Sequence, residues 1–485
     1  MTKKLKDILT KIDYEIISGS DNVEINNISF DSRKIKPGSL FIAVKGYETD
    51  GHKFIDSAVK NGAVAVIAEN IENINTENIN LIKVSNTSKT AASAASEFFD
   101  NPSHKLKLIG ITGTNGKTTV ATLLYEYFIE AGFKSGLIST VKNRINKKEI
   151  EAKHTTPDAI TFNGLLKEMV DEGCEYCFAE VSSHAIHQNR IFGLKLSGAV
   201  FTNITHEHLD YHKTFSEYLK VKKQFFDKLP EDAFALVNID DKNGKIILQN
   251  TKAKKYTYAL KNPADFKTKI LEMHIDGTLI SINDKEFWYL LAGKYNAYNI
   301  TAVYATAVLL GQNPDAVMRI LSGLKPVKGR FETIEINGIT AVIDYAHTPD
   351  ALENILNTIN ELKKTGQNLI CIIGAGGNRD KTKRPVMAKI AFEKSDKLIL
   401  TSDNPRNENP EDILNDMFEG LNEKQKNKTL KIPDRKEAIK IAANTAKKGD
   451  IILIAGKGHE NYQIINGKKY HFDDKETVEN ILKNI

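Results

Sequence analysis

The stretch GITGTNGKTT, residues 110–119, decides the fold of this 485-residue chain. KLKLIGIT (105–112) predicts a β-strand from its branched apolar residues, and KTTVATLLYEYFIEAG (117–132) predicts a helix. Glycines between a strand and a helix let the backbone wrap phosphate oxygens, and the helix N-terminus adds partial positive charge. Lys117 would reach the terminal phosphates, and the Thr118 hydroxyl would bind Mg2+. Ile111 stands where the strict pattern has glycine, so this is a variant phosphate loop.

Strand and helix patterns alternate on both sides of this loop, which favours an α/β protein with mainly parallel sheets. Further apolar strands are expected at 176–182, 198–204, 233–239, 341–346, 369–374, 397–402 and 451–456. At roughly 150 residues per domain, the length predicts three domains. We expect an N-terminal α/β domain at 1–100, a central P-loop ATPase-like parallel sheet at 101–328 and a C-terminal Rossmann-like domain at 329–485.

Three polar motifs follow strands of the third domain: AGGNRDK (375–381), DNPR (403–406) and GKGHE (456–460). In open α/β sheets, ligands bind beyond the carboxyl ends of the strands. We therefore expect the three motifs to converge on one crevice.

The composition is that of a globular protein without a nucleic-acid signature. Its 67 basic residues are interspersed with 62 acidic ones, whereas nucleic-acid-binding proteins cluster their basic residues. Neither a signal-peptide core nor a run of about 18 apolar residues occurs, so we expect a cytoplasmic protein without a membrane span. Cys174, Cys177 and Cys371 are expected to be ordinary thiols, and a redox or metal role for the C-x-x-C pair is the less favoured alternative.

Acidic and imidazole side chains gather after two central strands. Glu180 lies near the end of one strand, where P-loop proteins hold an acidic residue for Mg2+. The segment TNITHEHLDYH and its neighbourhood add His187, His206, His208, Asp210 and His212. A structural role is the default for any single histidine, and the H-x-H-x-x-x-H spacing makes zinc a weaker alternative. We favour magnesium, which prefers oxygen ligands and can accept one imidazole.

Nine motifs occur in an order that resembles the Mur ligases. They are GTNGKTT, EVSSHAIHQNR, FTNITHEHLDYH, GKYNAYNITA, GRFE, DYAHTPDALE, GGNRDKTKRP, DNPR and GKGHE. DSRKIKPGSLFIAVKG (31–46) extends the resemblance over essentially the whole chain. Single motifs of this kind recur elsewhere, whereas the ordered set is specific to the family.

The resemblance implies a three-domain, ATP-dependent ligase that forms an amide on a cytoplasmic peptidoglycan precursor. The N-terminal domain would bind UDP-N-acetylmuramoyl-L-alanyl-D-glutamate (UDP-MurNAc-L-Ala-D-Glu), the central domain ATP and Mg2+, and the C-terminal domain meso-diaminopimelate. ATP would phosphorylate the D-glutamate γ-carboxylate, and the amine would then displace phosphate from the acyl phosphate. The enzyme would act as a monomer. Lanthionine and L-lysine are the alternative amines.

The resemblance also implies site residues, motif by motif. Catalytic roles would fall to Lys117, Glu180, His208 and Lys222. ATP would be bound by Gly113, Thr114, Asn115, Gly116, Lys117, Thr118, Thr119, Asn299, Arg330, Asp344 and His347. The uridine-nucleotide substrate would contact Ser32, Thr155, Thr156, Ser182, Gln188 and Arg190. The amino acid would contact Arg379, Asp403, Asn404, Pro405, Arg406, Gly456 and Glu460. The metal would be held by Thr118, Glu180, His208 and a carbamate on Lys222.

Two positions leave alternatives open. Lys220 and Lys223 flank Lys222, so either could carry the carbamate, or the three could be an exposed helical cluster. His154 departs from the family pattern before Thr155, which leaves its contact to the muramyl-peptide end open.

Arginine is scarce, since only nine of the 67 basic residues are arginines. Seven of them lie in or beside the motifs: Arg33, Arg190, Arg330, Arg379, Arg384, Arg406 and Arg435. Where lysine supplies ordinary charge, arginine is expected wherever a planar five-donor fork is needed. Diaminopimelate differs from lysine by a distal carboxylate, which Arg406 could bind through two parallel hydrogen bonds. Arg406 is therefore the predicted selectivity residue, with Asp403 and Asn404 beside it and Glu460 for the distal ammonium; it would not distinguish lanthionine.

Two other classes of function are disfavoured. Intact Lys117, Glu180 and Lys222 argue against a non-catalytic binding protein on this fold. A generic P-loop kinase would explain neither the C-terminal crevice nor residues 31–46.

Overall fold

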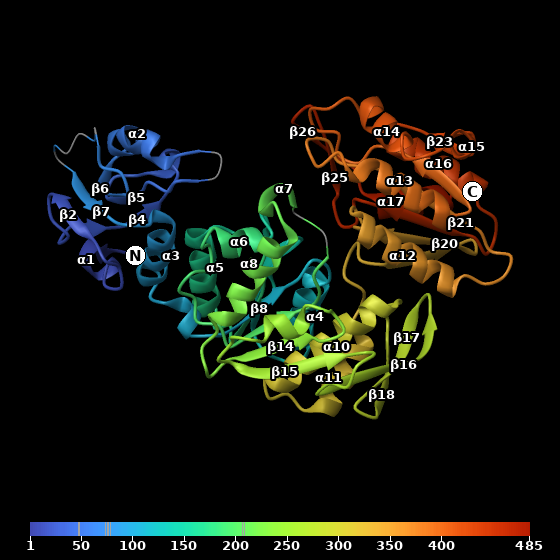
Figure 1. Ribbon diagram of the computed structural model, residues 1–485, viewed down its shortest axis with the longest axis horizontal. Helices are drawn as coiled ribbons and strands as arrows, with labels where there is room; N and C mark the ends of the chain where they lie inside the picture. Colours follow the sequence, from blue (N-terminus) through green and yellow to red (C-terminus); the bar gives the residue numbers. More distant parts are fainter. Residues whose placement is uncertain (47–48, 73, 75–76, 78, 206, 208) are drawn as a thin grey trace.

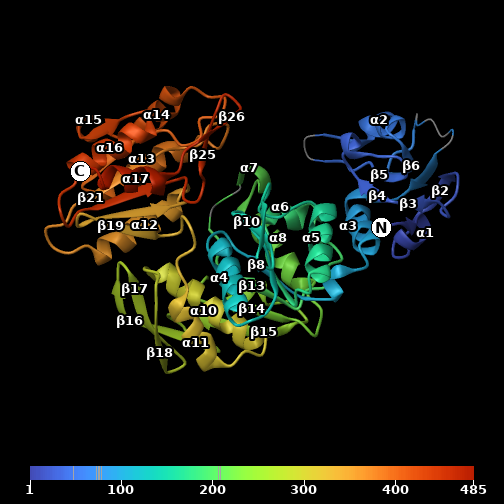
Figure 2. The ribbon, with the colours of Figure 1, turned by 180° about the vertical axis from the view of Figure 1, so that it is seen from behind.

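The chain folds into three α/β bodies that follow one another in sequence order (Figure 1). The computed structural model describes residues 1–46, 49–72, 74, 77, 79–205, 207 and 209–485. The views from the front and from behind both place the N-terminal and C-terminal bodies on opposite sides of the central one (Figure 1, Figure 2). The predicted three-domain α/β fold is therefore confirmed.

The N-terminal body is built on a five-stranded sheet with the order β2-β7-β6-β5-β4. Its strands are β2 (Glu15–Ser18), β4 (Asn27–Ser29), β5 (Ser39–Ile42), β6 (Ala63–Ala68) and β7 (Asn80–Lys83), and its helices are α1 (Leu5–Ile8), α2 (Ile55–Lys60) and α3 (Thr87–Phe98). Alternate residues of β5 face opposite layers, because strand side chains alternate with a period of two. Leu40 and Ile42 join the core cluster that contains α3, and Phe41 joins the cluster that contains α2.

The central body contains an 11-stranded sheet with the order β11-β10-β9-β12-β8-β13-β14-β15-β16-β17-β18. Its parallel part is β9 (Ser135–Ile138), β12 (Tyr176–Glu180), β8 (Lys107–Thr112), β13 (Gly198–Phe201), β14 (Phe234–Asn238), β15 (Lys254–Ala259) and β16 (Phe266–His274). Antiparallel strands end the sheet: β10 (Lys142–Ile145), β11 (Lys148–Glu151), β17 (Gly277–Ile282) and β18 (Lys285–Tyr289). Its helices are α4 (Lys117–Glu130), α5 (Ala159–Asp171), α6 (Ser183–His187), α7 (Leu209–His212), α8 (Phe215–Asp227), α9 (Gly244–Ile247), α10 (Lys294–Leu309) and α11 (Pro314–Gly323).

Strand β8 lies inside this sheet, between β12 and β13, and the loop 113–116 leaves its carboxyl end. Ile109 and Ile111 pack into the core that contains α4 and α10, whereas Leu108 packs into the core that contains α5 and α8. Gly110 has no side chain because the Phe225 ring of α8 occupies that space, 2.5 Å from where a Cβ would stand. This close packing brings α8 up to the phosphate loop.

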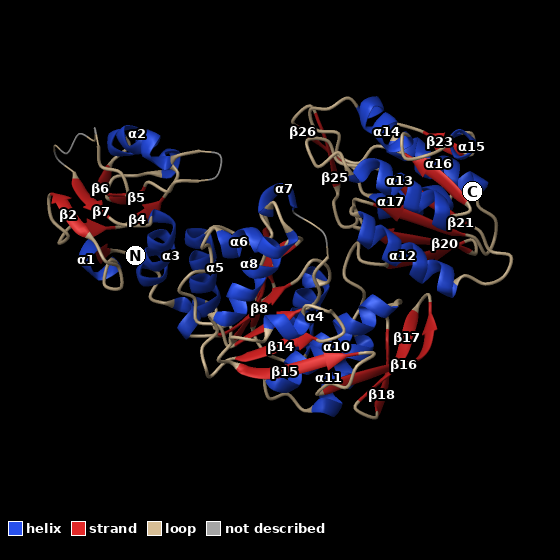
Figure 3. Cartoon of the chain, in the orientation of Figure 1, coloured by secondary structure: helices blue, strands red, loops and turns tan. Residues whose placement is uncertain are grey.

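The C-terminal body has a six-stranded sheet with the order β19-β20-β24-β21-β22-β23, parallel apart from the β19–β20 pair. Its strands are β19 (Glu332–Ile336), β20 (Ile339–Asp344), β21 (Leu369–Ile373), β22 (Lys397–Leu400), β23 (Thr429–Lys431) and β24 (Ile451–Ala455). Helices α12 (Pro349–Leu362), α13 (Lys383–Lys394) and α14 (Pro410–Phe418) cover one face, and α16 (Arg435–Thr445) and α17 (Asp474–Leu482) cover the other (Figure 3). A short helix, α15 (Glu423–Lys426), precedes β23.

The hairpin β16–β17 belongs to the central sheet, whereas a hairpin at 462–471 forms a separate two-stranded sheet. The Asp-Gly signal at 276–277 predicts the β16–β17 hairpin, which is confirmed by its antiparallel pairing. A second hairpin, β25 (Tyr462–Ile465) and β26 (Lys468–His471), was not predicted, although Asn466 and Gly467 have the positive φ angles, 49° and 76°, of a two-residue hairpin turn.

Candidate active site

A cleft of about 460 Å³ lies between the central and C-terminal bodies. Its walls include most of the residues predicted for ATP: Thr114, Asn115, Gly116, Lys117, Thr118, Thr119, Asn299, Arg330, Asp344 and His347. At least two hydrogen bonds between described residues cross it. Asn115 Nδ2 donates to Asp350 Oδ2 at 2.8 Å, and Arg330 Nη2 donates to Thr118 Oγ1 at 3.3 Å. The phosphate loop therefore already contacts the C-terminal body.

Gly113 determines the shape of the phosphate loop, and the Lys117 side chain turns back to contact the backbone of that loop. Gly113 has a φ of 154°, and a Cβ there would stand 1.9 Å from the Thr202 hydroxyl. The Lys117 amine donates to the carbonyl oxygens of Gly113 at 3.0 Å and Thr114 at 2.8 Å. Burial lowers the pKa of Lys117, while the Glu207 and Glu180 carboxylates raise it in opposition. An anionic phosphate would reverse that lowering, since opposite charge favours the ammonium form.

Glu180, the last residue of β12, is fully buried beside the same loop. Its carboxylate accepts hydrogen bonds from the Thr140 backbone N–H at 2.8 Å and the Thr140 hydroxyl at 3.1 Å. Glu180 and Thr118 both line the cleft, and carboxylate and hydroxyl oxygens are the donors that Mg2+ prefers. The donor set thus fits the predicted metal. His208, the predicted imidazole ligand, and His206 lie outside the described residues.

The side chain of Lys222, on α8, extends to the start of the phosphate loop. Its side chain is 1% exposed, and its amine donates to Thr112 Oγ1 at 3.2 Å and to the Gly113 carbonyl at 3.0 Å. Burial lowers the pKa of Lys222 well below its ordinary value, and the positive charge of Lys117 lowers it further. By contrast, Lys220 is exposed and Lys223 pairs with Asp227 at 2.7 Å. Of these three lysines, only Lys222 reaches the phosphate loop.

The C-terminal body supplies the opposite wall of the cleft. The Arg330 guanidinium lies over the Tyr345 ring, 4.5 Å from its centroid, and the buried Arg330 Nε has no hydrogen-bond partner within the described part of the chain. Asp344 accepts the N–H groups of Phe331 at 2.7 Å and Ala346 at 2.8 Å. Burial raises the pKa of Asp344, against the lowering effect of Arg330. Arg330 therefore has a hydrogen-bond donor available beside the phosphate loop.

Most of the residues predicted for the uridine-nucleotide substrate form a connected group beside Glu180. Thr156 Oγ1 donates to the Glu180 carbonyl at 2.8 Å and accepts the Ser182 N–H at 3.0 Å. Arg190 donates to the Thr156 carbonyl at 2.8 Å and to Gln188 Oε1 at 2.7 Å. Thr155 Oγ1 accepts from the Thr140 hydroxyl at 3.0 Å and lines the cleft.

Two other positions lie apart from this group. Ser32 belongs to the N-terminal body, where its carbonyl accepts a hydrogen bond from Asn61 at 2.9 Å. His154 is exposed. Among the described residues of the N-terminal body, Ser88 reaches the group: its hydroxyl donates to the Gln188 carbonyl at 2.8 Å.

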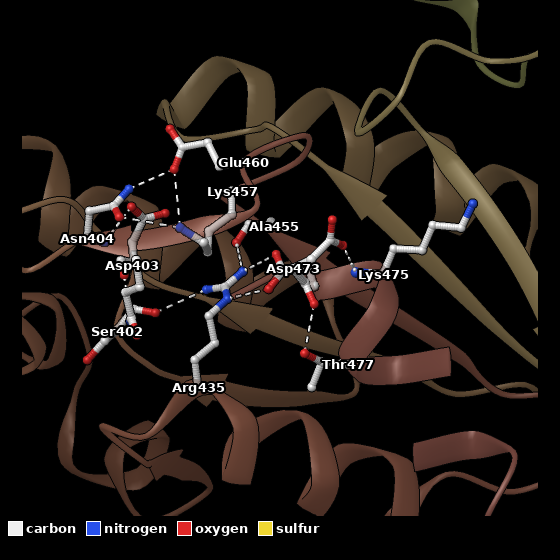
Figure 4. Close-up of polar contacts among 12 residues, drawn as sticks. Ser402, Asp403, Asn404, Arg435, Ala455, Lys457, Glu460, Asp473, Lys475 and Thr477 are labelled. Carbon is white, nitrogen blue, oxygen red and sulfur yellow. Dashed lines mark hydrogen bonds and ion pairs between the residues drawn. The ribbon is translucent and has the colours of Figure 1, made fainter. Parts of the chain in front are cut away.

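Three of the predicted amino-acid residues, Asp403, Asn404 and Glu460, come together at the strand ends of the C-terminal sheet (Figure 4). Asn404 Nδ2 donates to Glu460 Oε2 at 2.7 Å, and the Asn404 N–H donates to Asp403 Oδ1 at 2.6 Å. Burial raises the pKa of Asp403, but Lys457 and Arg435 outweigh it and leave that pKa below its ordinary value. For Glu460 the balance is reversed, because burial and the Asp403 carboxylate raise its pKa more than Lys457 lowers it.

Arg406 lies at the edge of this group in an uncommon backbone conformation. Its φ is 55°, in the left-handed region that residues other than glycine rarely adopt. Its Nη1 donates to the Gly377 carbonyl at 2.7 Å, and its N–H donates to the Ile464 carbonyl at 3.0 Å. A strained backbone retained at an arginine points to a use for its side chain. Arg379 is exposed on the neighbouring loop.

The sequence prediction missed what holds this group in place. Arg435 donates to both carboxylate oxygens of Asp474 at 2.7 Å, and both side chains are fully buried. Arg384, also fully buried, contacts Glu408 at 2.9 Å and Asp416 at 2.6 Å. The scarcity of arginine had marked both positions as needing a guanidinium fork. Their partners, far away in sequence, gave no local signal.

Outside the cleft, the three cysteines are buried free thiols, as expected. Burial raises the pKa of each, so their thiolates form less readily than usual. Among the helices that the structure describes, none has the length and apolar character to cross a bilayer.

Comparison with known proteins finds members of one family along the whole chain. Three stretches match family descriptions: "Mur ligase family, catalytic domain" at 24–106, "Mur ligase middle domain" at 111–307 and "Mur ligase, glutamate ligase domain" at 329–458. The chain is 53% identical to the UDP-N-acetylmuramoyl-L-alanyl-D-glutamate–2,6-diaminopimelate ligase of Parabacteroides distasonis, covering 99% of each chain. It is 42% identical to the corresponding ligase 1 of Clostridium acetobutylicum, covering 99% of this chain and 100% of that one.

Solved structures agree. A structure titled UDP-N-acetylmuramoyl-L-alanyl-D-glutamate–2,6-diaminopimelate ligase has a TM-score of 0.71 at 32% identity, covering 100% of this chain and 99% of that one. A MurF ligase from Thermotoga maritima in complex with ADP has a TM-score of 0.63 at 20% identity, covering 95% of this chain and 97% of that one, and supports the fold alone.

Proposed function

Because this chain belongs to the Mur ligase family, we propose that it adds meso-diaminopimelate to the D-glutamate γ-carboxylate of UDP-MurNAc-L-Ala-D-Glu, with ATP as the energy source. The product would be a cytoplasmic peptidoglycan precursor. The observation that carries this proposal is one cleft lined by a phosphate loop, a buried carboxylate and an arginine from the opposite body. Relatives that match the chain end to end and are named for this reaction support it.

Each body would contribute one ligand. Residues 1–100 would hold the uridine nucleotide, 101–328 would bind ATP, and 329–485 would bind the incoming amino acid. The connected group around Thr156 and Arg190 would hold the peptide end of the first substrate next to Glu180. This arrangement would bring the γ-carboxylate to the phosphate end of ATP.

In the first step, a γ-carboxylate oxygen would form a bond to the γ-phosphorus while the bond to the β-phosphate oxygen breaks, giving an acyl phosphate and ADP. When bound, Mg2+ would screen the charge that develops on the phosphoryl oxygens. Lys117 would leave its two carbonyl partners and contact the phosphates, and Arg330 would approach them from the C-terminal body. The two cations offset the repulsion between two anionic reactants.

In the second step, the amine nitrogen would form a bond to the acyl carbon while the carbon–oxygen bond to phosphate breaks. The nitrogen loses a proton, and inorganic phosphate leaves. Closure of the C-terminal body over the cleft would align the two atoms, which lowers the entropic part of the barrier. The Asn115–Asp350 hydrogen bond already joins the two bodies that would close on the cleft.

Lys222 would act as a carbamate. Burial lowers its pKa and so favours the neutral amine, whose nitrogen could bond to the carbon of CO2 and release a proton. The product carries a carboxylate-like anion close to Thr112 and Gly113, where a bare ammonium would repel a metal ion. Its position at the phosphate loop favours Lys222 over Lys220 and Lys223.

Arg406 would select the amine. The Gly377 carbonyl occupies one of its donors, and its remaining donors could bind the distal carboxylate of diaminopimelate. L-Lysine lacks this group and would leave a desolvated guanidinium without its partner, so the site would reject it. Lanthionine has the same end group and would be accepted.

The test is an ATP-dependent assay with meso-diaminopimelate, lanthionine, L-lysine and L-ornithine, following phosphate release and product mass. We expect turnover with the first two amines and little with the others. Turnover of L-lysine at least equal to that of diaminopimelate would overturn the specificity. The absence of product with every amine would overturn the ligase proposal itself.

A further inference from the structure

Lys457 is a fully buried lysine in the middle of the predicted amine site. Its side chain is 0% exposed, and its amine donates to Glu460 Oε2 at 3.2 Å and to Asn404 Oδ1 at 3.4 Å. It also lies over the Tyr462 ring, 5.7 Å from the centroid. Figure 4 shows the amine pointing toward Asn404 and Glu460. Neither the motif comparison nor the proposed mechanism gives this cation a role.

Arg435 fixes the backbone at the start of each of the two loops that Lys457 joins. Besides its pair with Asp474, Arg435 donates to the Ser402 carbonyl at 3.2 Å and to the Ala455 carbonyl at 3.0 Å. Ser402 precedes the DNPR loop, and Ala455 precedes the GKGHE loop. Arg435 therefore fixes the strand ends, and Lys457 connects the side chains beyond them.

The buried charges of this cluster do not cancel. Arg435 and Asp474 neutralise one another, which leaves Lys457 between the carboxylates of Asp403 and Glu460. Asp403 is 8% exposed and the Glu460 side chain 15% exposed, so neither charge is well screened by water. Counted as ionised, Arg435, Lys457, Asp474, Asp403 and Glu460 sum to one negative charge, and without Lys457 they would sum to two; Arg406, at the edge of the group, is left for the distal carboxylate. One negative charge matches one ammonium.

We propose that Lys457 is a positioning residue for the amine substrate: it holds Glu460 and Asn404 in place and leaves the site with the single negative charge that one ammonium neutralises. This inference rests on the proposed function, because it names a residue that prepares the amine site for its ligand. Lys457 itself would not contact the reacting atoms. Its hydrogen bond fixes the Glu460 oxygen, and the shared contact with Asn404 ties that oxygen to the DNPR loop.

The proposal has a consequence for pH dependence. The groups that face Glu460 are Asp403, Asn404, Arg435, Tyr345, Tyr462 and Lys457. Burial and Asp403 already raise the pKa of Glu460, and Lys457 opposes them. Removing Lys457 would raise that pKa further, so less of the carboxylate would be ionised at neutral pH. The acid limb of kcat/KM for the amine, which reports groups of the free enzyme, would move to higher pH.

The experiment compares Lys457→Met, Lys457→Gln and Lys457→Arg with the wild type, using meso-diaminopimelate. Lys469→Met is the matched control, because Lys469 lies over the same Tyr462 ring, 4.4 Å from its centroid, on the exposed hairpin. Steady-state constants are measured for all three substrates across the whole pH range in which the wild type is active, so that the acid limb is sampled. Circular dichroism establishes which variants fold.

In Lys457→Met and Lys457→Gln we expect KM for diaminopimelate to rise about tenfold or more, the size of a lost charge-assisted hydrogen bond. The KM values for ATP and the uridine nucleotide should stay within about twofold, and the acid limb should move to higher pH. Lys457→Arg should restore the acid limb, and Lys469→Met should behave as wild type.

Folded Lys457 variants with unchanged diaminopimelate KM and acid limb would overturn the proposal. So would equal changes for all three substrates, or failure of both neutral variants to fold, since these results indicate a structural role. If the wild type itself uses none of the amines, the proposed function fails, and that failure is visible before any variant is compared.

Discussion

The ATP cleft and the amine site are prepared for their ligands in opposite ways. In the cleft, polar side chains surround a cavity of about 460 Å³, and Lys117 and Lys222 donate to the backbone of the loop they would serve. In the amine site, Asn404, Lys457 and Glu460 are bonded to one another and backed by the buried Arg435–Asp474 pair. The first region must redirect Lys117 when ATP arrives, whereas the second is assembled before its ligand.

The two regions therefore gain binding energy in different ways. Turning a lysine from a carbonyl to a phosphate exchanges one hydrogen bond for a stronger, charge-assisted one. The amine site gains instead from preorganisation, since side chains that are already ordered lose little entropy on binding. Substitutions in the cleft should therefore lower the rate of the reaction. Substitutions in the amine site should instead lower the stability of the C-terminal body or the selectivity for the amine.

The largest effect is expected for Arg435→Met, which removes one partner of a buried ion pair. An unpaired buried Asp474 should cost about 3–5 kcal/mol in the free energy of unfolding of the C-terminal body. Because a protein with several bodies need not unfold in one step, each body needs its own probe. Cys371 in β21 and Cys177 in β12 are fully buried thiols, one in each body.

Thiol labelling under native conditions, read by peptide mass, measures the two openings separately. Cys371 should label about 10²- to 10⁴-fold faster in Arg435→Met, because labelling follows the population of the open state and each 1.4 kcal/mol is about tenfold. Cys177 should label at the wild-type rate. Arg144→Met, which breaks a partly exposed pair with Glu126 in the central body, is the control and should change neither rate much. Equal acceleration of both thiols would remove the distinction between the two regions.

The next effect is on catalysis in the cleft. Lys222→Ala should lower kcat by about 10²–10³-fold, the usual cost of one preorganised electrostatic group. Added formate, a small carboxylate, should restore part of the activity by replacing the carbamate anion. Lys223→Ala removes a lysine one position away that pairs with Asp227, and should stay within about twofold of wild type, as surface pairs contribute little. Full activity of Lys222→Ala would sink the assignment.

The third effect is on selectivity. Arg406→Lys should lower kcat/KM for diaminopimelate by about 10- to 100-fold, because an ammonium cannot reproduce two parallel hydrogen bonds to a carboxylate. Turnover of L-lysine should change less, so discrimination between the two amines should narrow. Arg319→Lys, at an exposed arginine outside the motifs, serves as the control. Unchanged discrimination in Arg406→Lys would place selectivity elsewhere in the site.

These regions also differ in how far sequence alone predicts them. The strand, glycine turn and helix around Lys117 are contiguous, so residue type and spacing were enough to predict that unit. The convergence of DNPR and GKGHE could also be predicted, because parallel strands end at the same edge of a sheet. The number of domains followed from the chain length and the ordered motifs, and their α/β class from the alternating strand and helix patterns.

The support of the amine site could not be predicted in the same way. Arg435 and Asp474 are 39 positions apart, and nothing local says which carboxylate a buried guanidinium will meet. The hairpin at 462–471 has a turn signal but little apolar alternation, and it is stabilised by pairing with the DNPR loop: Ile464 N–H donates to Asn404 and Asn466 N–H to the Arg406 carbonyl. Lys457 looked like any other of the many lysines until burial set it apart.

The smallest expected effect concerns Glu408, at the outer edge of the amine site. Its hydrogen bond with Arg384 lowers the pKa of the Glu408 carboxyl from 4.5 to about 2. A depressed carboxyl pKa contributes stability that is present above the unfolded-state pKa and is lost as pH falls toward the folded-state value. Glu408→Gln should therefore destabilise the C-terminal body by about 1 kcal/mol near neutral pH, a value reduced by solvent screening of a carboxylate at the surface.

The difference from wild type should shrink between about pH 4.5 and pH 2, where the wild-type carboxyl is itself protonated. Cys371 labelling at neutral pH and urea unfolding followed by circular dichroism at lower pH measure it. Glu411→Gln, whose partner Lys431 lies 3.1 Å away on the surface, is the matched control and should show no such pH dependence. A Glu408→Gln difference that persists unchanged at pH 2 would mean that shape, and not charge, supports this edge of the site, in contrast to the buried Arg435–Asp474 and Lys457–Glu460 pairs.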